Sequence, residues 1–211
     1  MKIPDTIYLY RITHINNLDF IFKSQKISCP NSPDSDSNFI GIGDSSLIQR
    51  RKSRQIPIVP NVDFSDYVAF YFGARSPMLF NIQNGYNNVT KRPPEDIVYL
   101  ITNFETVKNN NSDFVFTDGH GYHHLSQFFK QETDLKEVDW KTVNLIRWND
   151  TEEDPDRKRK KQAEFLIHNE LTFSMILAIV VYNENAKSIV LTKLAANNIS
   201  CNVVVKPNYY Y

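Results

Sequence analysis

Residues 157–170 read RKRKKQAEFLIHNE and place a lone carboxylate beside a dense group of positive charges. Five consecutive basic residues, 157–161, come shortly before Glu164, which begins the apolar run EFLIH. Such a run is typical of a buried strand. Basic side chains attract phosphate groups, whereas a carboxylate repels them. A site that combines both is expected to handle a phosphorylated molecule and to stabilise positive charge at one of its carbon atoms.

Whether Glu164 can take part in chemistry depends on which face of the predicted strand carries its side chain. Successive side chains of a strand point to opposite faces. Glu164, Leu166 and His168 then share one face, while Phe165 and Ile167 share the other. The acid can therefore face a cleft while the aromatic ring packs in the core. A solvated glutamate paired with the nearby lysines is the simpler alternative, and the residues alone favour it.

A second polar group lies in TDGHGYHH, residues 117–124. Asp118 and two histidines at this spacing can ligate a divalent ion. However, His123 and His124 are adjacent and would point apart in a strand or a helix, so polar loop residues are favoured and no metal is expected. Glycines on both sides of His120 allow close backbone approach to a ligand. Since its ordinary pKa is near neutrality, His120 is the candidate for acid–base chemistry.

Length and composition indicate one folded domain. The chain has 211 residues, of which 41% are hydrophobic and 13% aromatic, enough for a sizeable core. Lys+Arg and Asp+Glu both total 24, so any basic surface must be local. Cys29 and Cys201 are expected to be free buried thiols. The sequence shows no signal peptide and no run of membrane-spanning length, which predicts a cytoplasmic protein.

The predicted elements are mostly strands. We expect strands at 6–12, 67–72, 96–101, 114–118, 163–168, 175–182 and 203–207, and short helices at 18–22 and 47–54. Residues 78–82 form a further element of unassigned type, and 125–140 favour helix with irregular ends. Residues 30–46, rich in Pro, Ser, Asp, Asn and Gly, are predicted to form a long functional or disordered loop. Because strands follow one another without helical crossovers, a mixed or antiparallel α+β fold is favoured over a doubly wound sheet.

No common nucleotide or zinc motif is present. The sequence lacks G-x-G-x-x-G, G-K-[ST], H-E-x-x-H and paired C-x-x-C, so Rossmann, P-loop and zinc sites have no motif to support them. Any phosphate-handling site must therefore be built from residues that are distant in the sequence.

Six segments along the chain form an ordered set: YRITHINNL near the start, LIQRR at 47–51, YVAFYFGARSPML at 67–79, FVFTDGH at 114–120, VDW at 138–140 and RKRKKQAEFLIH at 157–168. Taken in order, they resemble the DarT family of DNA ADP-ribosyltransferase toxins. The resemblance extends from about Tyr8 to Tyr182, and YFGARSPML together with KKQAEFL is its most specific part. It favours the branch that modifies thymidine over the branch that modifies guanosine.

The resemblance implies an α+β, ADP-ribosyltransferase-like fold, a split mixed β-sheet with helices packed around an NAD-binding cleft, in one domain over residues 1–211. The implied enzyme breaks the bond between nicotinamide and ribose of its co-substrate NAD⁺. It attaches ADP-ribose to a base of single-stranded DNA in a sequence-selective manner. The implied partners are single-stranded DNA and a DarG-like macrodomain antitoxin. A monomer is expected, with no membrane partner and no metal.

Matched position by position, Glu164 falls on the family's catalytic glutamate, Arg51 on its catalytic arginine and His14 on an NAD⁺-contacting histidine. Residues 34–53 correspond to the loop that closes over NAD⁺, and 120–164 to the segment that meets the target base. The predicted catalytic residues are Glu164, Arg51 and His120. The predicted cofactor-binding residues are Thr13, His14, Ile15, Asn17, Arg51, Tyr71 and Glu164. The predicted DNA contacts are Arg75, Met78, His120, Tyr122, Lys158, Lys160 and Lys161.

The chemistry needs Glu164 and Arg51 to converge on one pocket. Departure of nicotinamide leaves positive charge at the anomeric carbon, which a carboxylate stabilises. Arg51 can hold the pyrophosphate or a negative charge on the base, but its pKa, above about 12, makes it a poor proton acceptor. His120 is therefore our hypothesis for the base or relay. A non-catalytic single-stranded nucleic-acid-binding protein and a metal nuclease centred on Asp118 are the alternatives.

Overall fold

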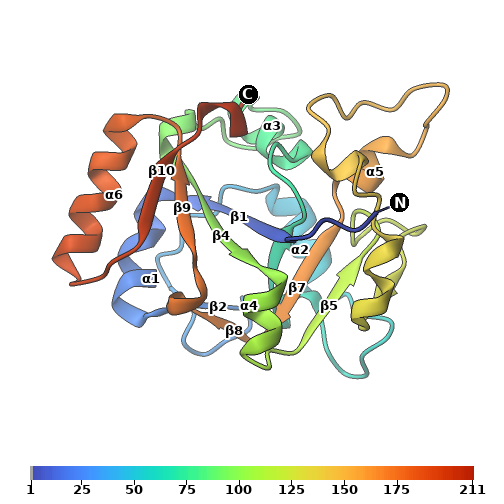
Figure 1. Cartoon of the computed structure of the whole chain (residues 1–211), viewed down its shortest axis with the longest axis horizontal. Helices are drawn as coiled ribbons and strands as arrows, with labels where there is room; N and C mark the ends of the chain where they lie inside the picture. The colour runs from blue at the N-terminus through green and yellow to red at the C-terminus, as the bar shows by residue number, and fades with distance from the viewer. Residues whose placement is uncertain (1) are drawn as a thin grey trace.

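The structure is a computed structural model that describes residues 2–211 (Figure 1). Within that range, the strands form an eight-stranded sheet in the order β10-β9-β4-β1-β3-β7-β5-β6 and a two-stranded sheet of β2 and β8. Neighbours in the large sheet run antiparallel, except for the parallel pair β9 and β10. The strands are β1 Tyr8–His14, β2 Lys26–Ser28, β3 Tyr67–Tyr71, β4 Ile97–Asn103, β5 Phe114–Thr117, β6 Phe128–Phe129, β7 Glu164–His168, β8 Glu170–Thr172, β9 Ala178–Val181 and β10 Asn202–Val205.

The large sheet is split between β1 and β3. β1 pairs with β4 along its whole length, but it meets β3 only where Tyr10 lies opposite Tyr71. Where the two strands diverge, the Arg11 guanidinium donates a hydrogen bond to the Ala69 carbonyl across the gap (2.9 Å). In a continuous sheet this carbonyl would accept a hydrogen bond from the neighbouring strand, and here the arginine side chain supplies the donor instead. The split opens a cleft in the middle of the sheet.

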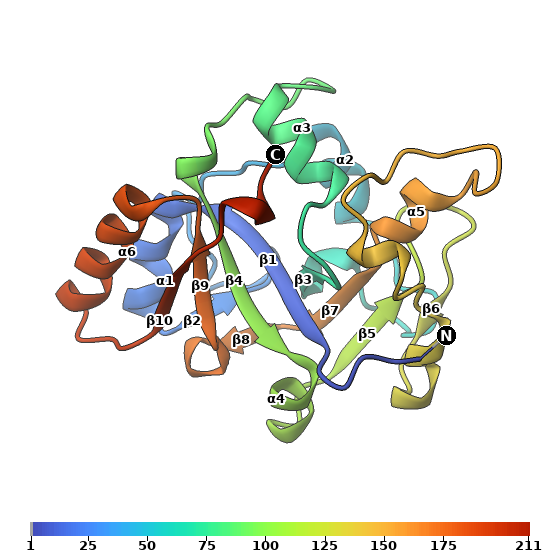
Figure 2. The same ribbon diagram turned by 45° about the horizontal axis from the view of Figure 1, so that its top comes forward.

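Short helices connect and cover the strands. Polar side chains begin several of them, because Asp44, Ser76 and Asn183 accept backbone N–H groups at the first turns of α2, α3 and α6. α1 and α6 lie side by side at one end of the molecule, far from α5 (Figures 1 and 2). The α-helices are α1 Leu18–Ser24, α2 Ser45–Lys52, α3 Pro77–Asn84, α4 Phe104–Asn109, α5 Arg157–Lys161 and α6 Glu184–Ala196. The 3-10 helices are η1 Ile15–Asn17, η2 Phe64–Asp66, η3 Pro94–Asp96, η4 Glu132–Glu137, η5 Thr142–Asn144, η6 Phe173–Met175 and η7 Pro207–Tyr209.

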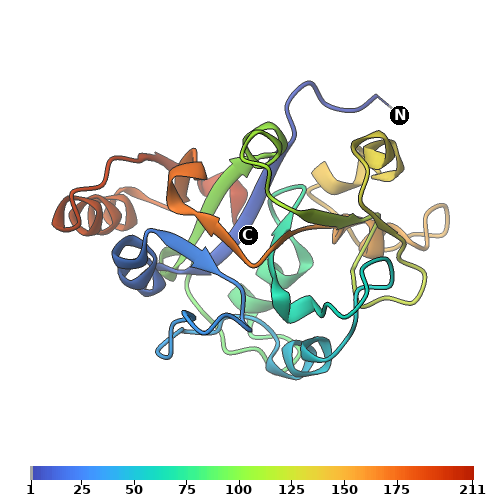
Figure 3. The same ribbon diagram turned by 90° about the horizontal axis from the view of Figure 1, so that it is seen from below.

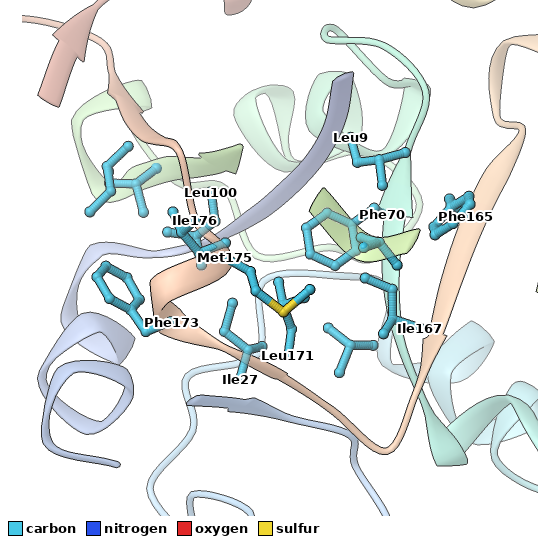
Figure 4. Packing of buried hydrophobic residues seen from close by; sticks show 14 of the residues in the cluster. Leu9, Ile27, Phe70, Leu100, Phe165, Ile167, Leu171, Phe173, Met175 and Ile176 are labelled. Atoms are coloured by element: carbon cyan, nitrogen blue, oxygen red, sulfur yellow. The ribbon is translucent and has the colours of Figure 1, made fainter. Parts of the chain in front are cut away.

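The two faces of β7 pack against different clusters, as its alternation predicts. Phe165 and Ile167 lie in the main core (Figure 4), and both are fully buried. Leu166 points the other way, into a smaller cluster with Phe64 and Val115. Each such side chain contributes roughly 1.5–3 kcal/mol of hydrophobic stabilisation. Burial on both faces holds the strand, and with it the position of Glu164, in a fixed register.

The predicted strands are confirmed, while several connecting segments differ. Residues 78–82 belong to helix α3, and Phe128–Phe129 forms the edge strand β6, followed by the 3-10 helix η4, where helix was expected. The basic run 157–161 is helix α5. The 175–182 strand is shorter than predicted, because η6 precedes it. Cys29 and Cys201 are free thiols. No helix within residues 2–211 is long and apolar enough to cross a membrane.

Candidate active site

A cleft of about 180 Å³ lies at the split in the sheet. β1 and β3 form two of its walls, Glu164 of β7 and Met78 of α3 contribute to others, and Arg51 of α2 reaches in from the side. Gly41, Ile42 and Gly43 cover it from the segment that joins β2 to α2. Figure 3 shows this segment, blue to cyan, along the lower edge of the molecule. The loop predicted to close over a ligand therefore forms one side of the cleft.

A neighbouring cavity of about 250 Å³ extends the cleft along β1. The two share Arg11 and Phe39, so they adjoin at these side chains. Thr13 and Asn17 line the second cavity together with residues of α1 and β2. The result is an elongated, two-part site with Glu164 at one end and Asn17 at the other.

Arg51 and Glu164 form a two-pronged ion pair in the cleft. Arg51 Nη1 lies 3.2 Å from Glu164 Oε1, and Nη2 lies 2.5 Å from Oε2. The Gly121 N–H also donates to Oε1 at 3.1 Å. Burial raises the pKa of Glu164, but the Arg51 charge and these hydrogen bonds outweigh it and lower the pKa. The predicted convergence of the two residues is confirmed, and Glu164 is ionised at neutral pH.

Local structure holds both partners of this pair in place. Glu164 begins β7 opposite Tyr71 of β3, and its N–H donates to the Thr117 hydroxyl at 3.0 Å. Arg51 lies near the end of α2, with its guanidinium 4.5 Å from the centre of the Phe64 ring. A side chain at Gly121 would place its Cβ 2.8 Å from that ring, so the close approach of this backbone requires glycine.

His120 lies beside the ion pair, in the turn that carries Gly121. Its N–H donates to the Arg159 carbonyl (2.9 Å), and its Nδ1 accepts the Tyr122 N–H (3.3 Å). Burial lowers the pKa of the His120 imidazole, the Glu164 charge opposes that shift, and the Arg51 charge adds to it. A neutral imidazole that accepts at Nδ1 carries its proton on Nε2. In this tautomer His120 presents a hydrogen-bond donor at Nε2, and its role as base or relay stays a prediction.

The basic run is largely neutralised by acids of the protein itself. Arg159 pairs with Asp156 at 2.7 Å and with Asp118 at 3.0 Å, and Lys160 pairs with Asp154 at 2.9 Å. Arg157 also pairs with Asp154, at 3.5 Å. The exposed Lys158 keeps no carboxylate partner among the described residues, and its Nζ lies 5.8 Å from the Trp148 ring centre. The five charges therefore do not act together as one cationic surface.

Lys161 does not reach a surface that DNA could contact. Its side chain is 3% exposed, and Nζ donates to the carbonyls of Ala74 (2.8 Å) and Val143 (2.7 Å). Burial, followed by the nearby Arg75 charge, lowers the pKa of the ammonium to about 8. The predicted DNA contact at this residue is thus corrected, because Lys161 joins three segments of the chain inside the protein.

The predicted cofactor residues divide into two groups. Thr13 and Asn17 line the larger cavity, and Tyr71 lines the cleft with Arg51 and Glu164. His14 and Ile15 line neither one. The His14 Nδ1 accepts the Asn16 N–H at 3.1 Å and begins η1, while Ile15 packs in the main core. The structure gives these two side chains structural contacts, and their part in cofactor binding stays a prediction.

The Asn17 side chain joins β1 to the loop that covers the cleft through hydrogen bonds. Its amide NH₂ donates to the Thr13 hydroxyl (2.9 Å) and to the Ile40 carbonyl (3.0 Å), and its carbonyl accepts the Ile40 N–H (2.9 Å). The side chain is 2% exposed. Ile40 lies between Phe39, which lines both cavities, and Gly41. Asn17 thus positions the loop through Ile40 and also lines the larger cavity, and its direct contact with the cofactor stays a prediction.

We predict that Asn17→Ala raises the KM for the ligand of this cleft about tenfold, with a smaller change in kcat, because loss of about 1.4 kcal/mol of loop positioning weakens binding. The Asn16→Ala variant is the matched control, since its exposed side chain makes no hydrogen bond within the described residues. Limited proteolysis within residues 30–44 should accelerate only in the Asn17 variant. Equal parameters and equal proteolysis in both variants would show that other contacts hold the loop.

The predicted DNA contacts lie in different parts of the structure. Met78 lines the cleft, and Tyr122 lies beneath Arg54, whose guanidinium is 4.7 Å from its ring centre. Trp140 and Trp148, two large aromatic residues of the segment expected to meet the base, are buried. Arg11 and Phe39 were missed by the sequence analysis. A charged residue alternating with apolar ones in YLYRITH was the signal that could have found Arg11.

Asp118 and the histidines do not form a metal centre. Among residues 2–211 no group of three or more His, Cys, Asp and Glu side chains is arranged to hold an ion. The Asp118 carboxylate accepts from Arg159 and from the Gln127 N–H, and the His123 and His124 rings stack 4.6 Å apart. These contacts give the polar cluster a structural explanation.

Comparison with known proteins identifies the family. A family model described as "ssDNA thymidine ADP-ribosyltransferase, DarT" matches residues 10–211. The chain belongs to the DarT family. A DNA ADP-ribosyl transferase of Escherichia coli O127:H6 is 30% identical over 99% of this chain and 95% of its own length. A Thermosipho africanus protein described as a fusion of DNA ADP-ribosyl transferase and DNA ADP-ribosyl glycohydrolase is 27% identical over 96% of this chain and 49% of its own.

Solved DarT structures share the whole fold. Thermus sp. 2.9 DarT in complex with ADP-ribosylated single-stranded DNA superposes with a TM-score of 0.92 at 30% identity, over 100% of this chain and 99% of that one. The same protein in complex with NAD⁺ gives a TM-score of 0.86 at 30% identity, over 100% of both chains. The predicted DarT family, α+β fold and DNA ADP-ribosyltransferase class are confirmed. A metal nuclease and a non-catalytic binding protein are set aside.

Proposed function

We propose that this chain transfers ADP-ribose from NAD⁺ to thymidine in single-stranded DNA and that it acts as a toxin opposed by a macrodomain antitoxin. The ion pair of Arg51 and Glu164 at the end of an elongated cleft carries this proposal. The family description names thymidine, and the Thermus relative is solved with NAD⁺ and with ADP-ribosylated DNA. The Thermosipho fusion, which joins a transferase to a glycohydrolase, supports an antitoxin partner of that chemistry.

Glu164 has the environment that the bond-breaking step needs. Cleavage between nicotinamide and ribose builds positive charge on the ribose, and an ionised carboxylate in a water-poor cleft stabilises that charge. Arg51 keeps Glu164 ionised and fixes its orientation through two parallel hydrogen bonds. The elongated shape of the two adjoining cavities suits a dinucleotide, with Thr13, Tyr71 and the loop held by Asn17 as further walls.

His120 is proposed to act on the acceptor base. It lines a third, polar cavity of about 330 Å³ that also includes Lys158. Its Nε2–H can donate to a carbonyl oxygen of the base and stabilise the negative charge that develops there as the ring nitrogen passes its proton to solvent water and bonds to the ribose carbon that nicotinamide has left. Met78, Tyr122, Lys158 and Lys160 are proposed as DNA contacts, Lys160 only where phosphate replaces Asp154. We further propose one catalytic domain, because the large sheet draws strands from both halves of the chain.

The lowered pKa of His120 predicts a pH dependence. Its folded-state pKa lies below the unfolded value, so the unfolded chain binds more protons in the intervening range, and this contribution to stability falls as pH decreases. Protonation also replaces the acceptor for the Tyr122 N–H with a donor. We therefore expect kcat/KM to hold through neutral pH and to decrease only below the ordinary histidine pKa, because the lowered folded-state pKa governs the activity.

His120→Asn and His120→Ala separate a chemical role of the His120 ring from its role as the acceptor of the Tyr122 N–H. Neither replacement titrates, but asparagine keeps an acceptor for the Tyr122 N–H, whereas alanine does not. If His120 contributes chemistry, both variants should lose about 10²-fold in transfer rate. If the asparagine variant transfers ADP-ribose at nearly the wild-type rate, and its kcat/KM does not fall at acidic pH, then His120 only organises its turn.

Labelled NAD⁺ and a pool of single-stranded oligonucleotides test the function as a whole. We expect covalent transfer of label, and a mass spectrum of the product that shows ADP-ribose on thymidine. Transfer to guanosine would contradict the thymidine assignment while leaving the enzyme class intact. Toxicity on expression should be relieved by a DarG-like macrodomain protein. Absence of any transfer by the wild-type chain would refute the proposal.

A further inference from the structure

Arg75 lies in a turn whose backbone is held from several sides. It has a left-handed backbone (φ 57°), which is uncommon for a residue with a side chain. The Tyr99 hydroxyl accepts its N–H at 3.1 Å, and the Tyr211 hydroxyl donates to its carbonyl at 2.5 Å. Lys161 binds the preceding carbonyl, of Ala74. These contacts hold the backbone of the turn in one conformation, and they thereby fix the position from which the Arg75 side chain extends.

The side chain itself is left with unused donors. Its guanidinium lies 4.5 Å from the centre of the Tyr211 ring, and only Nη1 has an acceptor among the described residues, the Asn208 carbonyl at 3.3 Å. Nε is buried and has no partner. A ring that supports the flat face of a guanidinium leaves its edge free for a planar or tetrahedral anion. Figures 1 and 2 show the C-terminal segment beside α3, which this turn precedes.

Two positive charges meet here without a counter-ion. Among residues 2–211, no carboxylate oxygen lies within 4.0 Å of Arg75 or of Lys161. Arg157, Arg159 and Lys160 of the basic run differ, because each pairs with aspartate, whereas the unpaired Lys158 is exposed to solvent. Unpaired charge that the protein holds rigidly indicates a missing anion.

We propose that Arg75 binds a phosphodiester of the DNA strand, with the buried charge of Lys161 adding to the attraction. This inference rests on the proposed function and specifies where the strand is held. Tyr71 and Met78, on either side of the turn, line the cleft, whereas Arg75 lines neither the cleft nor the neighbouring cavity. The anion therefore belongs to a chain passing the rim of the cleft, and the pyrophosphate of NAD⁺ is the other source of the same chemistry.

Arg75→Gly and Arg75→Ala test the contact without disturbing the turn. Both tyrosine hydroxyls bind backbone atoms, which remain in each variant, and glycine also relieves the left-handed conformation. Each variant should raise the KM for the oligonucleotide about tenfold and reduce the slope of log affinity against log salt by about 0.7. The KM for NAD⁺ should not change. Lys23→Ala, which removes an exposed charge from α1, should stay within about twofold.

The possible results are distinguishable. A rise in the KM for NAD⁺ with an unchanged KM for the oligonucleotide would assign the phosphate to NAD⁺ and overturn the proposal. An effect equal to that of Lys23→Ala would also overturn it, since general charge would then explain the binding. Oligonucleotide binding measured by fluorescence anisotropy requires no turnover. It therefore tests the Arg75 contact even if the wild-type chain transfers no ADP-ribose, which would be a failure of the proposed function alone.

Discussion

Glu164→Gln is expected to reduce the rate of ADP-ribose transfer by about 10³-fold, because the substitution keeps the size of the side chain but removes the negative charge. Glutamine still offers an oxygen to the Gly121 N–H and to one nitrogen of Arg51. It cannot stabilise positive charge on the ribose. Initial rates with labelled NAD⁺ and a thymidine-containing oligonucleotide measure the effect, and expression of the variant should no longer be toxic.

Glu170→Gln is the matched control for this experiment. Glu170 lies on β8, pairs with Lys26 at 2.9 Å and is exposed, so its loss should change the rate by less than about twofold. Thermal unfolding of both variants excludes a trivial loss of structure. A Glu164→Gln protein that unfolds normally and transfers at the wild-type rate would remove the carboxylate from the mechanism.

Gly73→Ala is expected to destabilise the protein by about 3 kcal/mol, because the new Cβ would lie 2.1 Å from the Val143 carbonyl oxygen and 3.1 Å from its carbon. The obstacle is backbone, so no side-chain rotation removes it. The same oxygen accepts a hydrogen bond from Lys161, and separating the two segments would break that contact. For a chain of this size the melting temperature should fall by roughly 6–12 °C, measured by calorimetry.

Gly41→Ala provides the comparison, since a Cβ there has no neighbour within 4 Å. It should leave the melting temperature within about 2 °C of the wild-type value. Transfer activity should also fall in Gly73→Ala, because the turn that follows carries Arg75 and leads to Met78. If Gly73→Ala melts like the wild type, the docking of residues 141–145 against this turn contributes little to stability.

Local patterns in the sequence determined the strands and the face of its strand on which Glu164 lies. The alternation in EFLIH placed Glu164 and Phe165 on opposite faces, and the structure shows Phe165 in the main core and Glu164 in the cleft. That pattern is readable because the period of a strand is two residues whatever surrounds it. Pairing Arg51 with Glu164, more than a hundred residues away, came from the ordered motifs of the family and not from periodicity.

Tertiary structure alone decided what each charge does. Lys158 and Lys161 look equivalent in RKRKK, yet one is exposed and the other is buried against carbonyls from residues 74 and 143. Asn17 donates a hydrogen bond to the Ile40 carbonyl, and Arg11 donates one across the split to the Ala69 carbonyl. No local sequence pattern predicts either partner. Hydrogen bonds and ion pairs act over about 3 Å in space, and the chain brings those atoms together only after it has folded. The sequence therefore indicates which residue types are available, whereas the packing of distant segments assigns each of them its partner.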